Sequence, residues 1–238
     1  MTEGVRGSAV AARRRARQHE IVAATRALFD ARGMRDANID DIAKSVGINR
    51  TIIYRHVASK EELFALTLAE YLRELRDRIE SQDDESADPV RRIQRMGEEF
   101  AVFGGQYPAF LDCALALLRK PGEDLLADIG DAALLRLGRL MAVLLGRISA
   151  VLRRGVELGA FEVEDPDLAA TLLYTQLLGM LHVARVGFYV RGSDPNLPEL
   201  VRVDPAQISR LAVHAMLTSV LAPGQAVPAS SQVTGRCC

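Results

Sequence analysis

One stretch constrains the fold of this chain more than any other: NIDDIAKSVGINRTIIYRHVASKEE, residues 38–62. It predicts two short helices and the start of a third. Asn38 can cap the first helix with its side-chain oxygen, and Asp40 and Asp41 place negative charge where the helix dipole favours it. Gly47 ends this helix, because glycine adopts the left-handed conformation without a steric penalty.

The second helix of this stretch can be capped by Asn49, and its two sides differ in character. The apolar side is Ile52, Ile53 and Val57, and the exposed side is Arg50, Thr51, Tyr54 and Arg55. Ser59 and Glu62 then have the spacing of a capping box, which opens the third helix. Helix, glycine-containing turn and helix form the helix-turn-helix arrangement, whose second helix enters the DNA major groove.

The residues around this stretch also match a known family at several points. The matching residues are Phe29, Gly33, Ile42, Ala43, Gly47, Ile48, Tyr54, His56, Ser59, Lys60, Glu62 and Leu63. Over about residues 20–66, the chain resembles the N-terminal domain of TetR-family transcriptional regulators. Met34 and Val57 depart from the usual pattern as packing substitutions. Thr51 and Ile52 depart from it in the recognition helix, so they bear on which operator sequence is bound.

The candidate DNA-binding residues are Asn38, Lys44, Asn49, Arg50, Thr51, Tyr54, Arg55, His56 and Lys60. Arg50 can pair with guanine through two hydrogen bonds, and Thr51 can offer its methyl group to thymine. In the family pattern, Tyr54, His56 and Lys60 contact phosphates, which fixes the register without reading sequence. The alternatives are a packing role for Tyr54 and ordinary solvated side chains at His56 and Lys60.

The distribution of charge supports a nucleic-acid partner, although the net charge of the chain is only −1. Residues 1–60 carry 12 Lys and Arg against 6 Asp and Glu, whereas the remainder carries 18 against 25. A basic end on an acidic body suits a protein that presents one end to phosphate. Arg13, Arg14, Arg15 and Arg17 could reach phosphate or a minor groove, or could simply open a solvated helix.

The rest of the chain predicts an all-α fold, with an N-terminal three-helix DNA-binding domain and a C-terminal helical ligand-binding and dimerisation domain. Further helices are expected at about 13–32, 59–80, 90–105, 108–119, 123–158, 167–190 and 205–221, with Gly130, Gly138 and Gly146 able to bend the long one. The expected organisation is a disordered arm at 1–12, the DNA-binding domain at 13–66, the regulatory domain at 67–221 and a disordered tail at 222–238. The helix at 59–80 is long enough to link the two domains.

Residues 89–190 contain more apolar surface than a DNA adaptor needs, and the resemblance implies a ligand pocket there. The candidate ligand-binding residues are Phe100, Phe103, Tyr107, Phe110, Met141, Leu145, Tyr174, Leu178, His182 and Arg185. An apolar cavity with few polar groups would favour a small hydrophobic or amphipathic effector. The alternative is that most of these residues are plain core, with His182 a satisfied interior histidine.

Motifs for other chemistries are missing from the sequence. It contains no GxSxG, GxxxxGK or GxGxxG, and its four histidines are scattered away from any metal-ligand spacing. We therefore expect no catalytic residue, no cofactor and no metal. Cys113 is expected to be core rather than a redox sensor, and three cysteines form no disulfide framework. With no signal-peptide core at the N-terminus, a cytoplasmic protein is expected.

The sequence is therefore interpreted as a homodimeric, ligand-responsive DNA-binding regulator, most simply a repressor on a palindromic operator. The dimer would form through the helices at about 167–190 and 205–221, and the partners would be duplex DNA and the effector, with no membrane. One alternative is an effector-independent DNA-binding regulator with a filled core. Another is a helical enzyme of lipid metabolism that merely resembles the family.

Overall fold

The computed structural model describes residues 2–34, 38–192 and 198–228, and it divides into two compact units. The first unit comprises Met1–Glu74 and Tyr107–Met141, and the second comprises Leu75–Gln106 and Ala142–Cys238. Residues 107–141 thus pack with the N-terminal part of the chain. The sequence did not indicate this grouping, and the predicted domain boundary at residue 66 stays a prediction.

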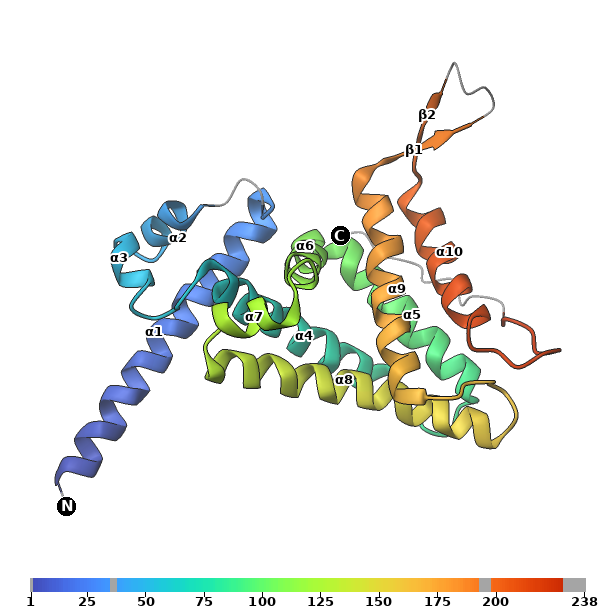
Figure 1. Ribbon diagram of the computed structural model, residues 1–238, viewed down its shortest axis with the longest axis horizontal. Coiled ribbons are helices and arrows are strands. Elements are labelled where there is room, and N and C mark those ends of the chain that lie inside the picture. Colours follow the sequence, from blue (N-terminus) through green and yellow to red (C-terminus); the bar gives the residue numbers. More distant parts are fainter. Residues whose placement is uncertain (1, 35–37, 193–197, 229–238) are drawn as a thin grey trace. The chain divides into compact units, whose positions relative to one another are not determined.

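In the described residues of the first unit, every regular element is a helix (Figure 1). Its elements are α1 (Thr2–Arg32), α2 (Ile39–Ser45), α3 (Arg50–Ile53), the first part of α4 (Lys60–Gln82), α6 (Pro108–Leu118), α7 (Gly122–Asp128) and the first part of α8 (Asp131–Glu157). Apolar side chains from α1, α3 and α4 form the core, among them Phe29, Ile53 and Leu63. Tyr71 closes this core, because its ring lies 6.1 Å from that of Phe110 and its hydroxyl donates to Asp30.

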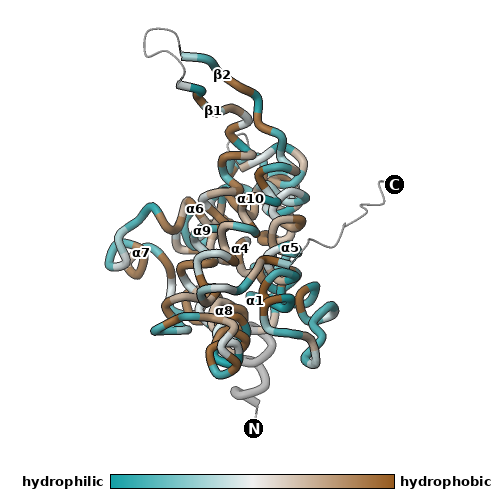
Figure 2. Tube along the Cα trace, turned by 90° about the vertical axis from the view of Figure 1, so that its right-hand side faces the viewer, coloured by the Kyte–Doolittle hydropathy of each residue, from teal (hydrophilic) through white to brown (hydrophobic). Residues whose placement is uncertain are grey.

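The second unit packs three helices side by side, α5 (Pro89–Gln106), α9 (Pro166–Val186) and α10 (Pro205–Thr218), as Figure 1 shows. The ends of α4 and α8 complete it. Between α9 and α10 the chain forms an antiparallel ribbon of β1 (Phe188–Arg191) and β2 (Glu199–Arg202). Figure 2 shows hydrophobic residues in both strands of this ribbon.

The expectation of a mostly helical fold is confirmed, with three differences. First, residues 1–12 were expected to be disordered, but α1 begins at Thr2. Once the helix from Arg13 exists, each added residue contributes a backbone hydrogen bond without a new nucleation cost. Second, the long helix expected at 123–158 is divided at Ile129 and Gly130 into α7 and α8.

The third difference is the ribbon, where the sequence predicted helix to residue 190 followed by a loop. Gly187 adopts a left-handed conformation with φ of 80° and caps α9, so the helix stops at Val186. The next residues, Phe188, Tyr189 and Val190, favour strands over helices. The disordered tail expected at 222–238 lies outside the described residues from 229 onward, and 225–228 carry no regular element.

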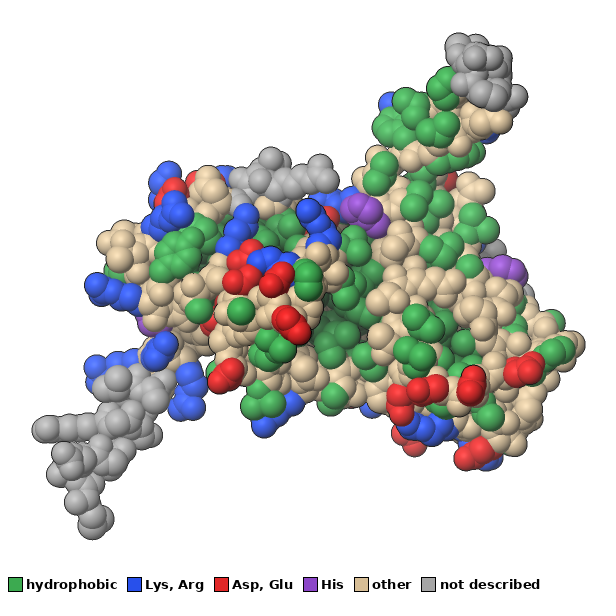
Figure 3. Space-filling model, viewed as in Figure 1, with side chains coloured by type: hydrophobic (Ala, Val, Ile, Leu, Met, Phe, Trp, Pro, Cys, Tyr) green, Lys and Arg blue, Asp and Glu red, His purple; other side chains and the backbone are tan. Residues whose placement is uncertain are grey.

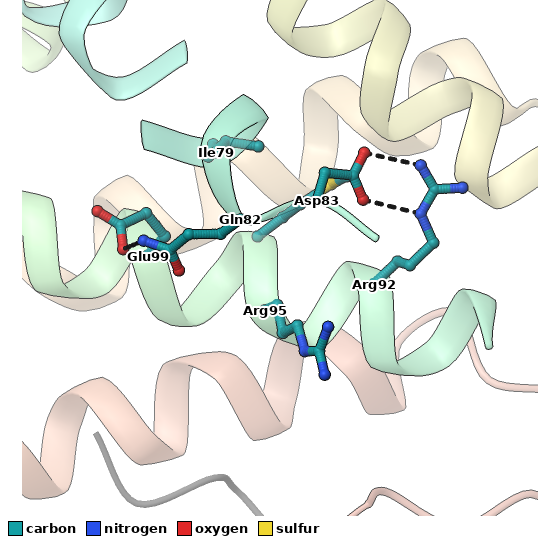
Figure 4. Close-up of a pocket in the computed structure, with 7 residues that line it drawn as sticks. Ile79, Gln82, Asp83, Arg92, Arg95 and Glu99 are labelled. Carbon is teal, nitrogen blue, oxygen red and sulfur yellow. Dashed lines mark hydrogen bonds and ion pairs between the residues drawn. The ribbon is translucent and has the colours of Figure 1, made fainter. Parts of the chain in front are cut away.

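A buried ion pair holds three helices of the second unit together. Arg92 on α5 donates from Nε and Nη2 to the two carboxylate oxygens of Asp83, at 2.9 and 2.7 Å (Figure 4). Arg147 on α8 donates to Asp83 as well, at 2.9 Å. The hydrogen bond from Arg92 holds the pKa of Asp83 below its usual value. The carboxylate therefore ties the end of α4 to α5 and α8.

No helix in the described part of the chain has, by itself, the length and hydropathy to cross a membrane, although the bent pair α5 and α6 meets that criterion when taken together.

Gly155 on α8 allows a close approach that we expect to be essential for packing in the second unit. A Cβ atom there would overlap the ring of Phe161, a side chain that is only 3% exposed. Gly155→Ala should therefore lower the free energy of unfolding by about 1–3 kcal/mol, measured by chemical denaturation. Gly146→Ala, on the same helix with open space around it, is the matched control. It should raise stability by about 0.5–1 kcal/mol; similar gains from both variants would contradict the packing argument.

Candidate DNA-binding site

The two short helices of the helix-turn-helix, α2 and α3, are each capped at the N-terminus by an asparagine. The Oδ1 atom of Asn38 accepts from the backbone N–H of Asp41 at 2.8 Å, and that of Asn49 accepts from Ile52 at 3.0 Å. Between them, Gly47 has a φ of 69° and turns the chain from α2 into α3. Both asparagine oxygens are therefore engaged within the protein, and these two predicted site residues position the helix-turn-helix.

The side chains of α3 divide as the sequence predicts. Ile53 is fully buried, and Val57, which follows the turn after α3, is 2% exposed, so these two side chains anchor the segment to the core. The exposed residues are Arg50, Thr51, Tyr54 and Arg55. The Arg50 guanidinium lies 5.6 Å from the centre of the Tyr54 ring, which aligns these two side chains. The helix thus presents a row of hydrogen-bonding groups on an anchored support.

Two further basic residues flank this row. Lys44 on α2 has a highly exposed side chain, 4.0 Å from Asp41. Lys60 begins α4, and its ammonium group lies 5.2 Å from the ring centre of Phe64. Figure 3 shows Lys and Arg side chains around α1 to α3. The charge asymmetry of the sequence therefore appears on the surface of the first unit.

His56 differs from the other predicted site residues because it is half-buried against α1. Its backbone carbonyl accepts from the side-chain amide of Gln18 at 3.0 Å. Partial burial lowers the pKa of His56 below its usual value, and the positive charges of Arg14 and Arg17 lower it further. The imidazole is therefore neutral near pH 7, and the arginine cluster of α1 lies close enough to influence it.

The start of α4 is held by a capping box that extends beyond the helix. The Ser59 hydroxyl accepts from the backbone N–H of Glu62 at 2.9 Å and donates to the carbonyl of Asp128 at 2.6 Å. The Glu62 Oε2 atom accepts from the backbone N–H groups of Ala58 and Gly130, both at 3.1 Å. The same two side chains thus satisfy the α4 N-terminus and the junction between α7 and α8.

The Glu62 side chain is buried, so its carboxylate needs hydrogen-bond donors from the protein. Glu62 is only 7% exposed, so its carboxylate depends on these N–H donors in place of water. Gly130 fits because a Cβ there would lie 3.1 Å from the Glu62 Oε2 atom. Beside it, Lys120 forms ion pairs with Glu61 and Asp128. Sequence reasoning found the capping box but missed residues 128–130, where the one available signal was a glycine noted as a possible bend.

The predicted ligand-binding residues fall into both units. Tyr107, Phe110 and Met141 belong to the first unit, and Phe100, Phe103, Leu145, Tyr174, Leu178, His182 and Arg185 belong to the second. Phe100 and Tyr174 meet edge to face at 5.8 Å, and burial raises the pKa of the Tyr174 phenol. Phe103 and Leu178 are fully buried, whereas His182 is half-buried and Arg185 is exposed.

Two hollows of the second unit are lined by other residues. The small hollow in Figure 4 is lined by Ile79, Gln82, Asp83, Arg92, Arg95, Met96 and Glu99. An open groove of about 530 Å³ is lined by Glu162, Val163, Ala169, Leu172, Leu173, Thr175, Gln176, Ser219 and Val220. The first includes the ion pair of Asp83 and Arg92 in its lining, and the second follows the N-terminal half of α9.

Cys113 lies in the core of the first unit, as the sequence predicts. Its side chain is fully buried, and burial raises the pKa of the thiol well above its usual value. The reactive thiolate is therefore disfavoured. Among the described residues, no three His, Cys, Asp or Glu side chains group as metal ligands.

Comparison with known proteins agrees with this geometry. The family model "Bacterial regulatory proteins, tetR family" matches residues 21–67, which span the end of α1, the two capped helices and the start of α4. The HTH-type transcriptional repressor KstR2 of Mycobacterium tuberculosis is 30% identical over 169 residues, which cover 69% of this chain and 78% of KstR2. The chain belongs to the TetR family of transcriptional regulators.

Solved structures of other proteins share the fold. RolR in complex with resorcinol superposes with a TM-score of 0.64 at 17% identity, covering 93% of this chain and all of RolR. SmeT, the repressor of the Stenotrophomonas maltophilia multidrug efflux pump SmeDEF, gives a TM-score of 0.54 at 21% identity, covering 89% of this chain and 96% of SmeT. The likeness to both structures thus extends well beyond the helix-turn-helix.

We expect the Glu62 carboxylate to be a main source of stability in the first unit. Glu62→Ala leaves the N–H groups of Ala58 and Gly130 without their acceptor and should lower the free energy of unfolding by about 1–3 kcal/mol. Glu61→Ala, which removes a half-exposed partner of Lys120, is the matched control and should cost about 0–1 kcal/mol. Equal losses in chemical denaturation would contradict a special role for Glu62.

Proposed function

We propose that this TetR-family chain is a ligand-responsive repressor that binds a palindromic operator as a homodimer. One observation supports the proposed binding to DNA. Arg50, Thr51 and Tyr54 are exposed together on a helix that is capped at its start and anchored by buried apolar residues on its other side. Such a rigid support holds side chains at base edges without losing affinity to disorder.

The proposed roles follow from the chemistry of each exposed side chain. Arg50 reads guanine through two hydrogen bonds, and Thr51 contacts a thymine methyl group. Tyr54, Arg55, Lys60 and Lys44 contact phosphates and fix the register. The main role of Asn38, Asn49 and His56 is to hold the helix-turn-helix in position. The side chains of the two asparagines and the backbone carbonyl of His56 accept hydrogen bonds from within the first unit.

Alanine variants separate base reading from phosphate contact. On a duplex selected by the wild-type protein from a random pool, Tyr54→Ala and Lys60→Ala should weaken binding about tenfold on every sequence. Lys60→Ala should also lower the salt slope of log K by about one. Arg50→Ala should instead relax the preference at one base pair, by about 1–3 kcal/mol in a competition assay.

Arg139→Ala is the control for the loss of one positive charge from the first unit, since Arg139 is exposed on α8. Its affinity should stay close to that of the wild type. Unchanged affinity in all three test variants would contradict DNA binding through α3 and the start of α4.

The proposed homodimer rests on the outward side of α9 and α10. Large apolar side chains there are unusually exposed: Leu168, Leu172, Val183 and Val186 on α9, and Leu211 on α10. An apolar stripe of this kind marks an interaction surface. A two-fold contact through it would pair two recognition helices, which address successive major grooves about 34–36 Å apart or slightly more.

The proposed effector is a small hydrophobic or amphipathic molecule. The RolR structure contains resorcinol, and a second SmeT structure, with a TM-score of 0.53 and 21% identity, contains triclosan. In this chain, the candidate contacts in the second unit centre on the edge-to-face pair Phe100 and Tyr174. The effector would release DNA only if it binds the two states unequally, typically by about 1–3 kcal/mol.

The second candidate is an effector-independent regulator with a filled core, and the complete burial of Phe103 and Leu178 favours it. Titration of the operator complex with a panel of small aromatic and aliphatic compounds separates the two. A compound that lowers operator affinity supports the ligand-responsive repressor. Constant affinity across the panel supports the filled core.

A further inference from the structure

The β ribbon between α9 and α10 exposes an apolar face. Phe188 pairs with Arg202 and Val190 pairs with Leu200, so these four side chains share one face. The other face of the ribbon carries Tyr189, Arg191, Val201 and Glu199. On the first face, Phe188 is 45% exposed, Val190 62% and Leu200 70%.

A ribbon of two short strands is marginally stable in water, and packing against another element is what normally stabilises it. This ribbon has little such packing within its own chain, because all but one of its eight residues are exposed. Figure 3 shows apolar side chains on the ribbon and along the visible face of α9. The ribbon therefore continues the apolar surface proposed above for dimerisation.

The open groove lies at the opposite end of α9. It is lined by Ala169, Leu172 and Leu173 of that helix and by Val220 after α10, whereas the ribbon follows the last residue of α9, Val186. At 1.5 Å per residue, Leu172 and Val186 are separated by about 21 Å along the helix. The ribbon consequently cannot reach the groove of its own chain.

We propose that the ribbon of one chain docks into the groove of a second copy, and that the ribbon of the second copy docks into the groove of the first. We call this reciprocal contact the clasp. This inference rests on the proposed homodimer and adds its specific contacts. In a two-fold contact that pairs α9 with α9 in opposite directions, the ribbon end of one helix faces the groove end of the other. Phe188, Val190 and Leu200 then cover the apolar groove wall.

The charges of the two surfaces are complementary. The apolar face of the ribbon carries Arg202, whose guanidinium lies 5.7 Å from the ring centre of Phe188. The groove includes the exposed Glu162, and the exposed Glu164 and Asp165 follow it along the chain. Attraction between Arg202 of the ribbon and the carboxylates at the groove favours one orientation of docking. It disfavours the orientation in which the ribbon is turned end for end.

Disulfide cross-linking tests the contact directly. In a Cys237→Ser, Cys238→Ser background, Val190→Cys with Leu172→Cys should give a covalent dimer on mild oxidation, visible on a non-reducing denaturing gel. The two positions are too far apart in one chain for an internal disulfide, which needs Cα atoms within about 7 Å. Val190→Cys with Leu126→Cys is the control, because Leu126 is exposed on α7 of the first unit.

The outcomes separate this inference from the proposed homodimer. A wild-type protein that sediments as a monomer would overturn both. A wild-type dimer in which the Val190–Leu172 pair cross-links no better than the control would overturn the clasp and leave the homodimer standing. Cross-linking of the Val190–Leu172 pair above both the control and Leu172→Cys alone supports the clasp, because Leu172 also lies on the proposed dimer surface.

A second measurement uses the strength of the dimer. Val190→Ser with Leu200→Ser should raise the dimer dissociation constant at least about tenfold, since each side chain loses apolar burial. Leu126→Ser with Leu135→Ser, two similarly exposed leucines of the first unit, should leave it unchanged. An unchanged dissociation constant in the ribbon variant, with helical content intact by circular dichroism, would overturn the proposal.

Discussion

The hydrogen bonds accepted by the Glu62 carboxylate are the interaction on which the DNA-binding end depends. One oxygen receives the N–H groups of Ala58, just before α4, and of Gly130, just before α8. A buried acceptor that loses such partners costs about 1–3 kcal/mol, which is a large share of the stability of a domain. The position of Lys60, the first residue of α4, therefore depends on where residues 128–130 lie.

This arrangement also gives the proposed regulation a physical route. The two helices that begin at the Glu62 site, α4 and α8, both continue into the second unit. A ligand that shifts α8 along its axis would pull the Gly130 N–H away from Glu62 and loosen the cap that orients Lys60. The cost of breaking a buried hydrogen bond is of the same order as a typical coupling free energy, about 1–3 kcal/mol.

Much of the local geometry of the candidate DNA-binding site could be predicted from sequence because its determinants are local. The caps at Asn38, Asn49 and Ser59 act over three residues, and the alternation of Ile53 and Val57 with Arg50 and Tyr54 belongs to one short segment, α3 and the turn after it. The contact between Glu62 and Gly130 spans 68 residues and has no local pattern. The candidate ligand residues show a second limit of prediction from sequence. The side chains that fill a core and those that line a pocket are equally apolar, so the sequence does not distinguish them.

The β ribbon shows how a strong local signal can be missed. The apolar pattern of α9 predicts a helix through residue 190, although Gly187 supplies a helix stop and the residues after it favour strands. The pairing of Val190 with Leu200 forms across a connection that carries no helical periodicity. The exposed apolar side chains on one face of the ribbon are the kind of surface that marks an interaction site, which is why it directs attention to a second copy.

Selection of bound duplexes from a random DNA pool tests the central claim most directly. The account predicts enrichment of an inverted repeat, whose two half-sites lie about one helical turn or slightly more apart, at physiological salt. Such a sequence should be bound at least about 10³-fold more tightly than unrelated duplexes. Recovery of a pool with no enriched sequence would contradict the assignment of α3 as a base-reading helix.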